Sequence, residues 1–120
     1  MRATGKTVQV FGTRKSSETR AALRFFAERR IAVHFVDLTQ RAASQGELRR
    51  FVDRFGVMNL VDKNSGRFKA LGLNSASYSE TRWFELLLAE PLLLRQPLLR
   101  YGTRIAIGLA PEDWKGWLAE

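Results

Sequence analysis

The 120-residue sequence has no cysteine and only one histidine, and both shortages exclude particular kinds of chemistry. Without a thiol the chain cannot form a disulfide, build a thiolate metal site or use a cysteine nucleophile. With His34 as the sole imidazole, neither a histidine-based metal cluster nor a Ser-His-Asp triad is expected. His34 lies in the strand-like run IAVHFVDL, so we interpret it as a packed or edge side chain.

Long apolar runs are also missing. No segment approaches the roughly 18 consecutive apolar residues of a membrane span, and the N-terminal MRATGK is too short and polar for the apolar core of a signal peptide. We therefore expect no membrane association and a cytoplasmic location. Hydrophobic residues at 45% and charged residues at 27% are typical of a globular protein, and the length fits one domain over residues 1–120.

Basic residues outnumber acidic ones by 20 to 12, which gives a net charge of +8. Such an excess attracts anionic partners, but these residues are spread from Arg2 to Lys115, as a solvated surface also would be. Nucleic acid as a partner is suggested by charge alone. The sequence has no recognised nucleic-acid motif, and its aromatic residues mostly fall at core spacing rather than as an exposed stacking ladder.

The first third of the chain has a strand, helix, strand pattern. Alternating valines predict a strand over residues 6–12, helical spacing of apolar residues predicts a helix over 17–30, and IAVHFVDL predicts a second strand over 31–38. Ser16 or Ser17 is a natural N-cap for the helix. The two strands should be parallel, and the nearly continuous apolar content of the second predicts burial on both faces.

The middle of the chain should be helical. Ser44-Gln45-Gly46-Glu47 has the spacing of a capping box and opens a helix that stops at Gly56, whereas residues 57–76 are less regular. Ser77-Tyr78-Ser79-Glu80 is predicted to be another capping box, opening a helix that Pro91 ends or bends.

The C-terminal part should be a hairpin and a last helix. PLLRY and RIAIGLA, separated by Gly102-Thr103, predict antiparallel strands, and Pro111 begins a helix that carries Trp114 and Trp117. The pattern as a whole predicts an α/β fold, a thioredoxin-like mixed sheet of about four strands flanked by helices, with a helical insertion. The residues expected inside the sheet are Val8, Val10, Val33, Phe35, Ile105 and Ile107.

From about residue 7 to residue 118 the chain resembles the arsenate reductase family of the thioredoxin superfamily, which also holds the Spx-type transcriptional regulators. The stretches that carry the resemblance are VFGTRKSSETR, VDL, GELRRFVDRFGVMNLVDKNSGRFKALGL, SETRWFELLLAEPLLLRQPLL and RIAIGLAPEDWKGWL. Their order and spacing together, rather than any one of them, make the resemblance specific.

The resemblance implies a nucleophilic cysteine at the start of the first helix and an arginine four residues later. Here the cysteine position holds Ser16 and the arginine position holds Arg20. Family members typically have arginine directly before a cis-proline, whereas this chain has Gln96 before Pro97, with the nearest arginine one residue earlier. That shift sends a strand side chain to the other face.

Two more arginine positions complete the comparison with the family. Arg104 matches an arginine that assists oxyanion binding, while the position of a further arginine falls near Leu60, where nothing is basic. A serine cannot be oxidised reversibly to a disulfide, so the family's electron transfer has no carrier in this chain. Plain N-capping explains Ser16 and Ser17, and anion binding at that cap is the alternative.

Two functions follow from the resemblance. The first is a non-catalytic interaction or regulatory module with a protein partner, as in the Spx-type relatives, using the exposed face of the first helix at Arg24, Glu28, Arg29 and Arg30. The second is an oxyanion-binding protein or glutathione-dependent reductase, in which an external thiol acts while Ser16, Ser17, Arg20 and Arg104 hold the anion. No cofactor is expected beyond glutathione in this second case, and no metal.

Overall fold

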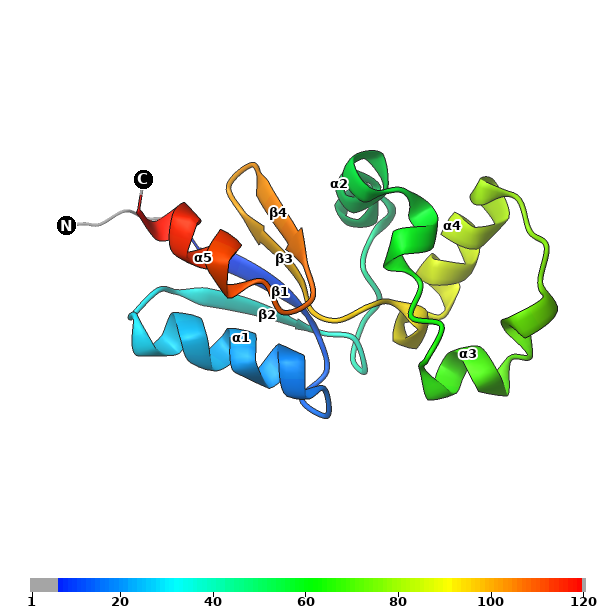
Figure 1. Ribbon diagram of the computed structural model, residues 1–120, viewed down its shortest axis with the longest axis horizontal. Coiled ribbons are helices and arrows are strands. Elements are labelled where there is room, and N and C mark those ends of the chain that lie inside the picture. The colour runs from blue at the N-terminus through cyan, green and yellow to red at the C-terminus, as the bar shows by residue number, and fades with distance from the viewer. Residues whose placement is uncertain (1–6, 120) are drawn as a thin grey trace. The chain divides into compact units, whose positions relative to one another are not determined.

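The computed structural model describes residues 7–119. The chain divides into two compact units, one made of Met1–Asp37 with Gln96–Glu120 and the other of Leu38–Arg95. The first unit holds the sheet, and the second is a helical segment inserted in the sequence between the second and third strands (Figure 1). Within the described residues, no helix is long and apolar enough to cross a membrane.

The sheet has four strands in the order β2-β1-β3-β4. They are β1 (Val8–Gly12), β2 (Val33–Asp37), β3 (Leu98–Tyr101) and β4 (Arg104–Ile107). β1 pairs in parallel with β2 and antiparallel with β3, and β3 pairs antiparallel with β4. The mixed four-stranded sheet is therefore confirmed. Lys6, where the first strand was predicted to begin, lies outside the described residues.

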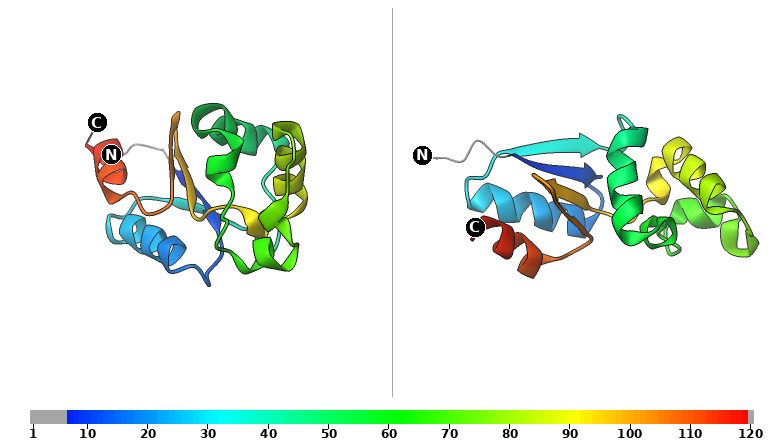
Figure 2. Two further views of the ribbon diagram at one scale, coloured as in Figure 1. Left: turned by 45° about the vertical axis from the view of Figure 1, so that its right-hand side comes forward. Right: turned by 90° about the horizontal axis from the view of Figure 1, so that it is seen from above.

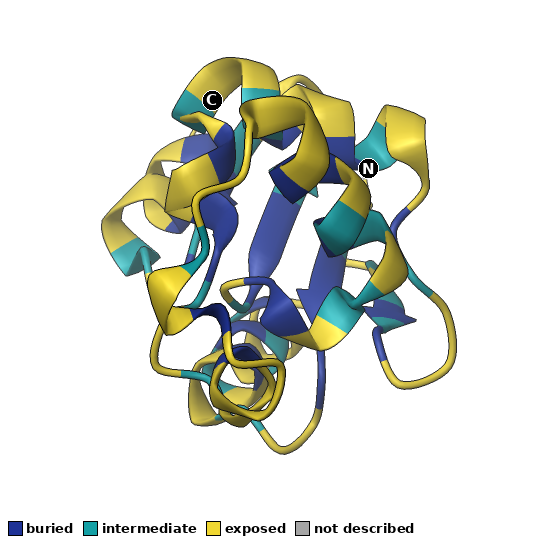
Figure 3. Cartoon of the chain, turned by 90° about the vertical axis from the view of Figure 1, so that its right-hand side faces the viewer, coloured by how far each residue is buried: buried dark blue, intermediate teal, exposed yellow. Residues whose placement is uncertain are grey.

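Two helices cover one face of this sheet, α1 (Ser17–Glu28) and α5 (Pro111–Leu118), as both views of Figure 2 show. α1 ends before residue 30 because Arg30 has a left-handed backbone, with a φ of 58°. Buried residues of the two helices and of the sheet form one hydrophobic core (Figure 3). The buried cluster consists of Val8, Val10, Ala22, Phe26, Leu99, Tyr101, Ala106, Trp114 and Trp117.

Four of the six residues predicted inside the sheet are only half-buried: Val33, Phe35, Ile105 and Ile107. Val8 and Val10, on the central strand β1, are fully buried as predicted. β2 and β4 are the edges of the sheet, so their side chains have a neighbouring strand on one side only. In β4 the alternation of side chains turns Ala106, not its two isoleucine neighbours, toward the helices.

The expectation that the second strand is buried on both faces is wrong. β2 is an edge strand in which only Val36 is buried. His34 is exposed on this strand and pairs with Gln9 of β1. Because side chains of paired residues share a face and alternate along a strand, His34 lies on the face opposite Val8 and Val10, away from α1.

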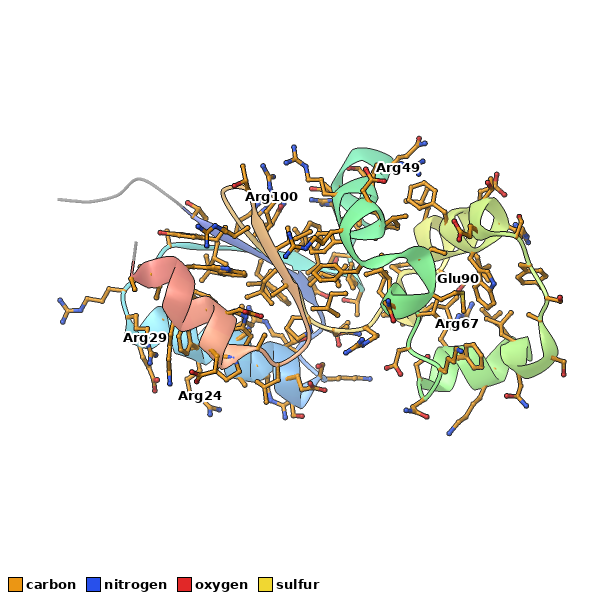
Figure 4. The ribbon with its side chains drawn as sticks, turned by 45° about the horizontal axis from the view of Figure 1, so that its top comes forward. Arg24, Arg29, Arg49, Arg67, Glu90 and Arg100 are labelled. Atoms are coloured by element: carbon orange, nitrogen blue, oxygen red, sulfur yellow. The ribbon has the colours of Figure 1, made fainter. Side chains whose placement is uncertain are left out.

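The second unit is built from short helices around a small apolar core. Its elements are α2 (Gln45–Phe55), η1 (Val57–Leu60), α3 (Gly66–Ala70), η2 (Leu73–Ser75), α4 (Glu80–Ala89) and η3 (Pro91–Leu93). Backbone bonds link η1 to the segment after α4, with Asp62 N donating to Leu93 O at 2.8 Å and Arg95 N donating to Leu60 O at 2.8 Å. The guanidinium of Arg67 also bonds Glu90, at 2.6 Å (Figure 4).

The caps of α2 and α4 differ from each other. α2 has the predicted capping box, in which Ser44 Oγ accepts from Glu47 N and Glu47 Oε1 accepts from Ser44 N. Arg41 binds both carboxylate oxygens of Glu47, at 2.9 and 3.1 Å. This pairing with Arg41, helped by the Ser44 amide, lowers the pKa of Glu47 to about 2.

The predicted capping box at Ser77 is wrong. The N-cap of α4 is Ser79, whose hydroxyl accepts from Arg82 N at 3.1 Å. The helix starts two residues later than the box required, so the residue three positions after the cap is an arginine. A guanidinium has no acceptor to offer the cap amide, and the reciprocal bond of a capping box cannot form.

Candidate functional site: the N-terminus of α1

The loop from β1 into α1 brings Ser16 to the N-cap position of the helix. Ser16 Oγ accepts from Thr19 N at 3.1 Å, and its carbonyl accepts from Arg20 N at 3.0 Å. Ser16 N in turn donates to Thr13 O at 3.1 Å. All three polar groups of this serine are therefore engaged in holding the turn.

Gly12 lets the first turn of α1 lie close to the end of β1. A Cβ added to Gly12 would lie 2.8 Å from Thr19 Cγ2, which is closer than packed carbon atoms approach. Thr19 is completely buried and Thr13 is nearly so. A glycine at the end of the strand is thus required to seat the helix.

Gln96 joins this loop to the start of β3. Its Oε1 accepts from Thr13 N at 2.7 Å and from Thr19 Oγ1 at 3.3 Å. The peptide bond between Gln96 and Pro97 is cis, and Pro97 O accepts from Gly108 N at 2.7 Å. Where the family resemblance implies a positively charged donor, this chain therefore has an acceptor that is already occupied by the protein's own hydrogen-bond donors.

Arg20 lies one turn into α1 and is exposed, but its guanidinium is engaged. Its Nη1 donates to Arg14 O, in the loop before the helix, at 2.7 Å. Arg14 stacks on Phe35 of β2, with 4.7 Å between the guanidinium carbon and the ring centroid. Arg20 therefore fastens the loop, and only its remaining donors can reach an anion.

The register of the sheet separates Arg104 from the other candidate residues. Arg104 pairs with Tyr101, which pairs with Val8 at the start of β1, whereas the helix N-terminus follows the other end of β1. These two ends of β1, Val8 and Gly12, are four residues apart, which is about 13 Å along the strand. In β4 the residue at the site end is Ile107, which pairs with Leu98. The structure thus brings Ser16, Ser17 and Arg20 together but leaves Arg104 at the far end of the hairpin.

Two amide groups remain available at this helix end. The N–H groups of Ser17 and Glu18 belong to the first turn and have no acceptor within the helix. They can stabilise negative charge together with the helix dipole. The carboxylate of Glu18 lies in the same turn and already supplies some of that charge. The arrangement therefore favours a bound anion only weakly.

The one imidazole of the chain is not placed to activate Ser16 as a general base. His34, the sole imidazole, lies on the opposite face of the sheet from α1. Among residues 7–119, no three acidic or histidine side chains cluster in a way that could hold a metal ion. The site can cap, bind and orient, but it holds no group that can carry electrons.

Thr13 and Thr19 are the site residues that the sequence did not reveal. Both residues are buried. Thr13 donates to Gln96 Oε1 from its backbone N–H and Thr19 donates from its hydroxyl, across 83 and 77 residues of the chain. Nothing in their immediate sequence distinguishes them from the exposed threonines. Only the pairing of β1 with β3 shows why they are buried there.

A mixed sheet whose first strand leads into a serine-capped helix beside a cis-proline defines a thioredoxin-like domain without the thiol. A model of the ArsC family matches residues 11–117, and the chain belongs to that family.

Solved structures show the same fold. A protein called YffB shares 23% sequence identity with a TM-score of 0.81, covering 91% of this chain and 96% of that one. An arsenate reductase from Vibrio cholerae shares 21% with a TM-score of 0.78, covering 92% and 96%. An ArsC-related protein from Brucella melitensis shares 18% with a TM-score of 0.69, covering 99% and 100%. No curated protein sequence matches the chain.

Proposed function

We propose that this chain is a non-redox member of the ArsC family, in which the fold acts as an interaction or regulatory module. The observation that carries the proposal is the state of Ser16. It stands where the resemblance implies the nucleophile, the chain has no cysteine elsewhere, and its hydroxyl is committed to capping α1. Gln96 supports the same reading, because its Oε1 accepts hydrogen bonds from Thr13 and Thr19 where the resemblance implies a positively charged donor.

The exposed face of α1 is the proposed contact surface for a protein partner. Arg24, Glu28, Arg29 and Arg30 are all exposed, and Figure 4 shows Arg24 on this helix and Arg29 at its C-terminal end. Arg29 is held in place, with its guanidinium carbon 3.6 Å from the centroid of the Phe25 ring and its Nη1 donating to Phe25 O. A side chain that is already fixed loses less entropy on binding than a mobile one. Because three of the four residues are arginines, we expect the partner surface to be acidic.

Turnover measurements test the non-redox proposal. We expect purified protein, supplied with arsenate, glutathione and glutaredoxin, to show no reduction above the protein-free background. Ser16→Ala should behave identically, because the serine has no chemical role. Turnover by the wild-type protein that Ser16→Ala abolishes would show that the site is catalytic after all.

The second candidate function is weak anion binding at the same helix end. The free amides of Ser17 and Glu18 favour it, with Arg20 nearby and Ser16 and Ser17 contributing hydroxyls. Glu18 and the distance of Arg104 from this helix end limit the affinity for phosphate to the millimolar range, which corresponds to about 4 kcal/mol at 1 mM. An NMR titration with phosphate should move the amides of residues 17–19. Shifts confined to scattered surface arginines would leave these residues as structural caps only.

A further inference from the structure

The helical unit contains a hollow that belongs to neither proposed function. It has a volume of about 380 Å³ and is lined by Lys63, Phe68, Lys69, Gly72, Leu73 and Asn74. All six lie between the end of η1 and the end of η2. The volume is within the range of roughly 300 to 1,000 Å³ that small-molecule sites occupy.

The base of the hollow is apolar and its rim is polar. Phe68 of α3 is 6% exposed and Leu73 of η2 is 5% exposed, so both are anchored in the core of the unit. Gly72, with a left-handed φ of 65°, turns the chain between these two residues. Lys63, Lys69 and Asn74 are exposed around them. This combination suits a ligand with one apolar and one polar end.

The two lysines give the rim an uncompensated positive charge. Among the described residues neither lysine has an acidic partner within salt-bridge distance, whereas the neighbouring Arg67 is neutralised by Glu90. Asp62, the nearest carboxylate in sequence, has its Oδ1 engaged by Asn64 N at 2.9 Å. Ser65 holds the same loop by donating from N and Oγ to Asp62 O. Lys63 therefore lies on a loop held by these hydrogen bonds, and Lys69 lies on the short helix α3 that follows it.

We propose that this hollow binds a small amphipathic anion, a carboxylate carried on a ring or short hydrocarbon, with the apolar part on Phe68 and Leu73 and the charge between Lys63 and Lys69. Burial of the apolar part supplies attraction that a bare anion lacks. Lysine heads are flexible point charges, which suits ligands that share this chemistry but differ in the shape of their apolar part.

Benzoate is the probe, followed by NMR on the full-length chain, and acetate is the comparison with equal charge and no ring. We expect benzoate to shift the amides of residues 68–74 in a saturable manner, with acetate at least about tenfold weaker, equivalent to about 1.4 kcal/mol. The double variant Lys63→Gln/Lys69→Gln should lose about tenfold in benzoate affinity, because both charges have gone.

A matched control removes two charges elsewhere. Lys15→Gln/Lys115→Gln has the same net charge as the test variant but leaves the hollow intact, so it should bind benzoate as the wild type does. If both double variants lost the same benzoate affinity, the loss would come from the overall charge of the protein and not from this hollow, and the proposal would be overturned. Equal binding of acetate and benzoate would overturn it too. So would saturable benzoate shifts that leave residues 68–74 unmoved and appear only elsewhere, for example at the anion site proposed for residues 17–19.

Discussion

Replacing Gln96 by methionine should destabilise the sheet unit, because it removes the acceptor that joins the α1 loop to β3. Methionine keeps the length of the side chain but cannot accept the bonds from Thr13 N and Thr19 Oγ1. A buried donor left without a partner costs about 1 to 3 kcal/mol. The Thr13 amide, bonded at 2.7 Å, should account for most of the loss, since the Thr19 hydroxyl can rotate toward a backbone carbonyl.

We expect a net loss of about 2 kcal/mol in the free energy of unfolding. Urea denaturation followed by circular dichroism measures it, and the melting temperature should fall by about 8 °C for a chain of this size. Gln96→Glu is the matched control at neutral pH, because a carboxylate retains both acceptors and is favoured near a helix N-terminus. A methionine variant as stable as the wild type, or a glutamate variant as unstable as the methionine one, would refute the reasoning.

Two further predictions concern the helical unit. The Glu47 carboxyl has a pKa of about 2, below its usual 4.5, so its stabilising effect is complete above about pH 4.5 and is lost as the pH falls through about 2. Glu47→Gln should therefore cost about 1 kcal/mol at pH 7, after allowance for the partial exposure of the pair with Arg41, and almost nothing near pH 2; a pH-independent cost in urea titrations would contradict this. Ser79→Ala should cost about 1 kcal/mol, whereas Ser77→Ala should stay within about 0.5 kcal/mol, and the reverse order would place the cap at Ser77.

Local sequence patterns predicted the start of α2 correctly and the start of α4 incorrectly. Ser44 and Glu47 have the capping-box spacing and form it. Ser77 and Glu80 have the same spacing, but the helix begins at Glu80, so Ser79 is the cap instead. Spacing identifies which residues can pair, whereas tertiary packing decides where the first turn begins.

Local sequence patterns could not predict features that depend on the order and register of the strands. The apolar run of β2 looks like a central strand, yet the order of the sheet makes it an edge. In β4 an apolar residue at each of positions 105–107 hides the alternation of the strand, so the choice of Ile105 and Ile107 as the inner residues picked the wrong face. In the site, Ser16 and Arg20 are related by local spacing, whereas the position of Arg104 depends on the hairpin register.

We propose that the end of α1 can stabilise negative charge although Ser16, and not a cysteine, stands there. The pKa of the thiol in Ser16→Cys tests it most directly, and the measurement is clean because the chain has no other cysteine. The rate of alkylation against pH gives this pKa, with Ser77→Cys, on an exposed loop, as the reference. The account predicts a thiol pKa about one unit below the ordinary value of about 8.5 in Ser16→Cys and an ordinary pKa in Ser77→Cys. A pKa in Ser16→Cys equal to or above that of Ser77→Cys would contradict it.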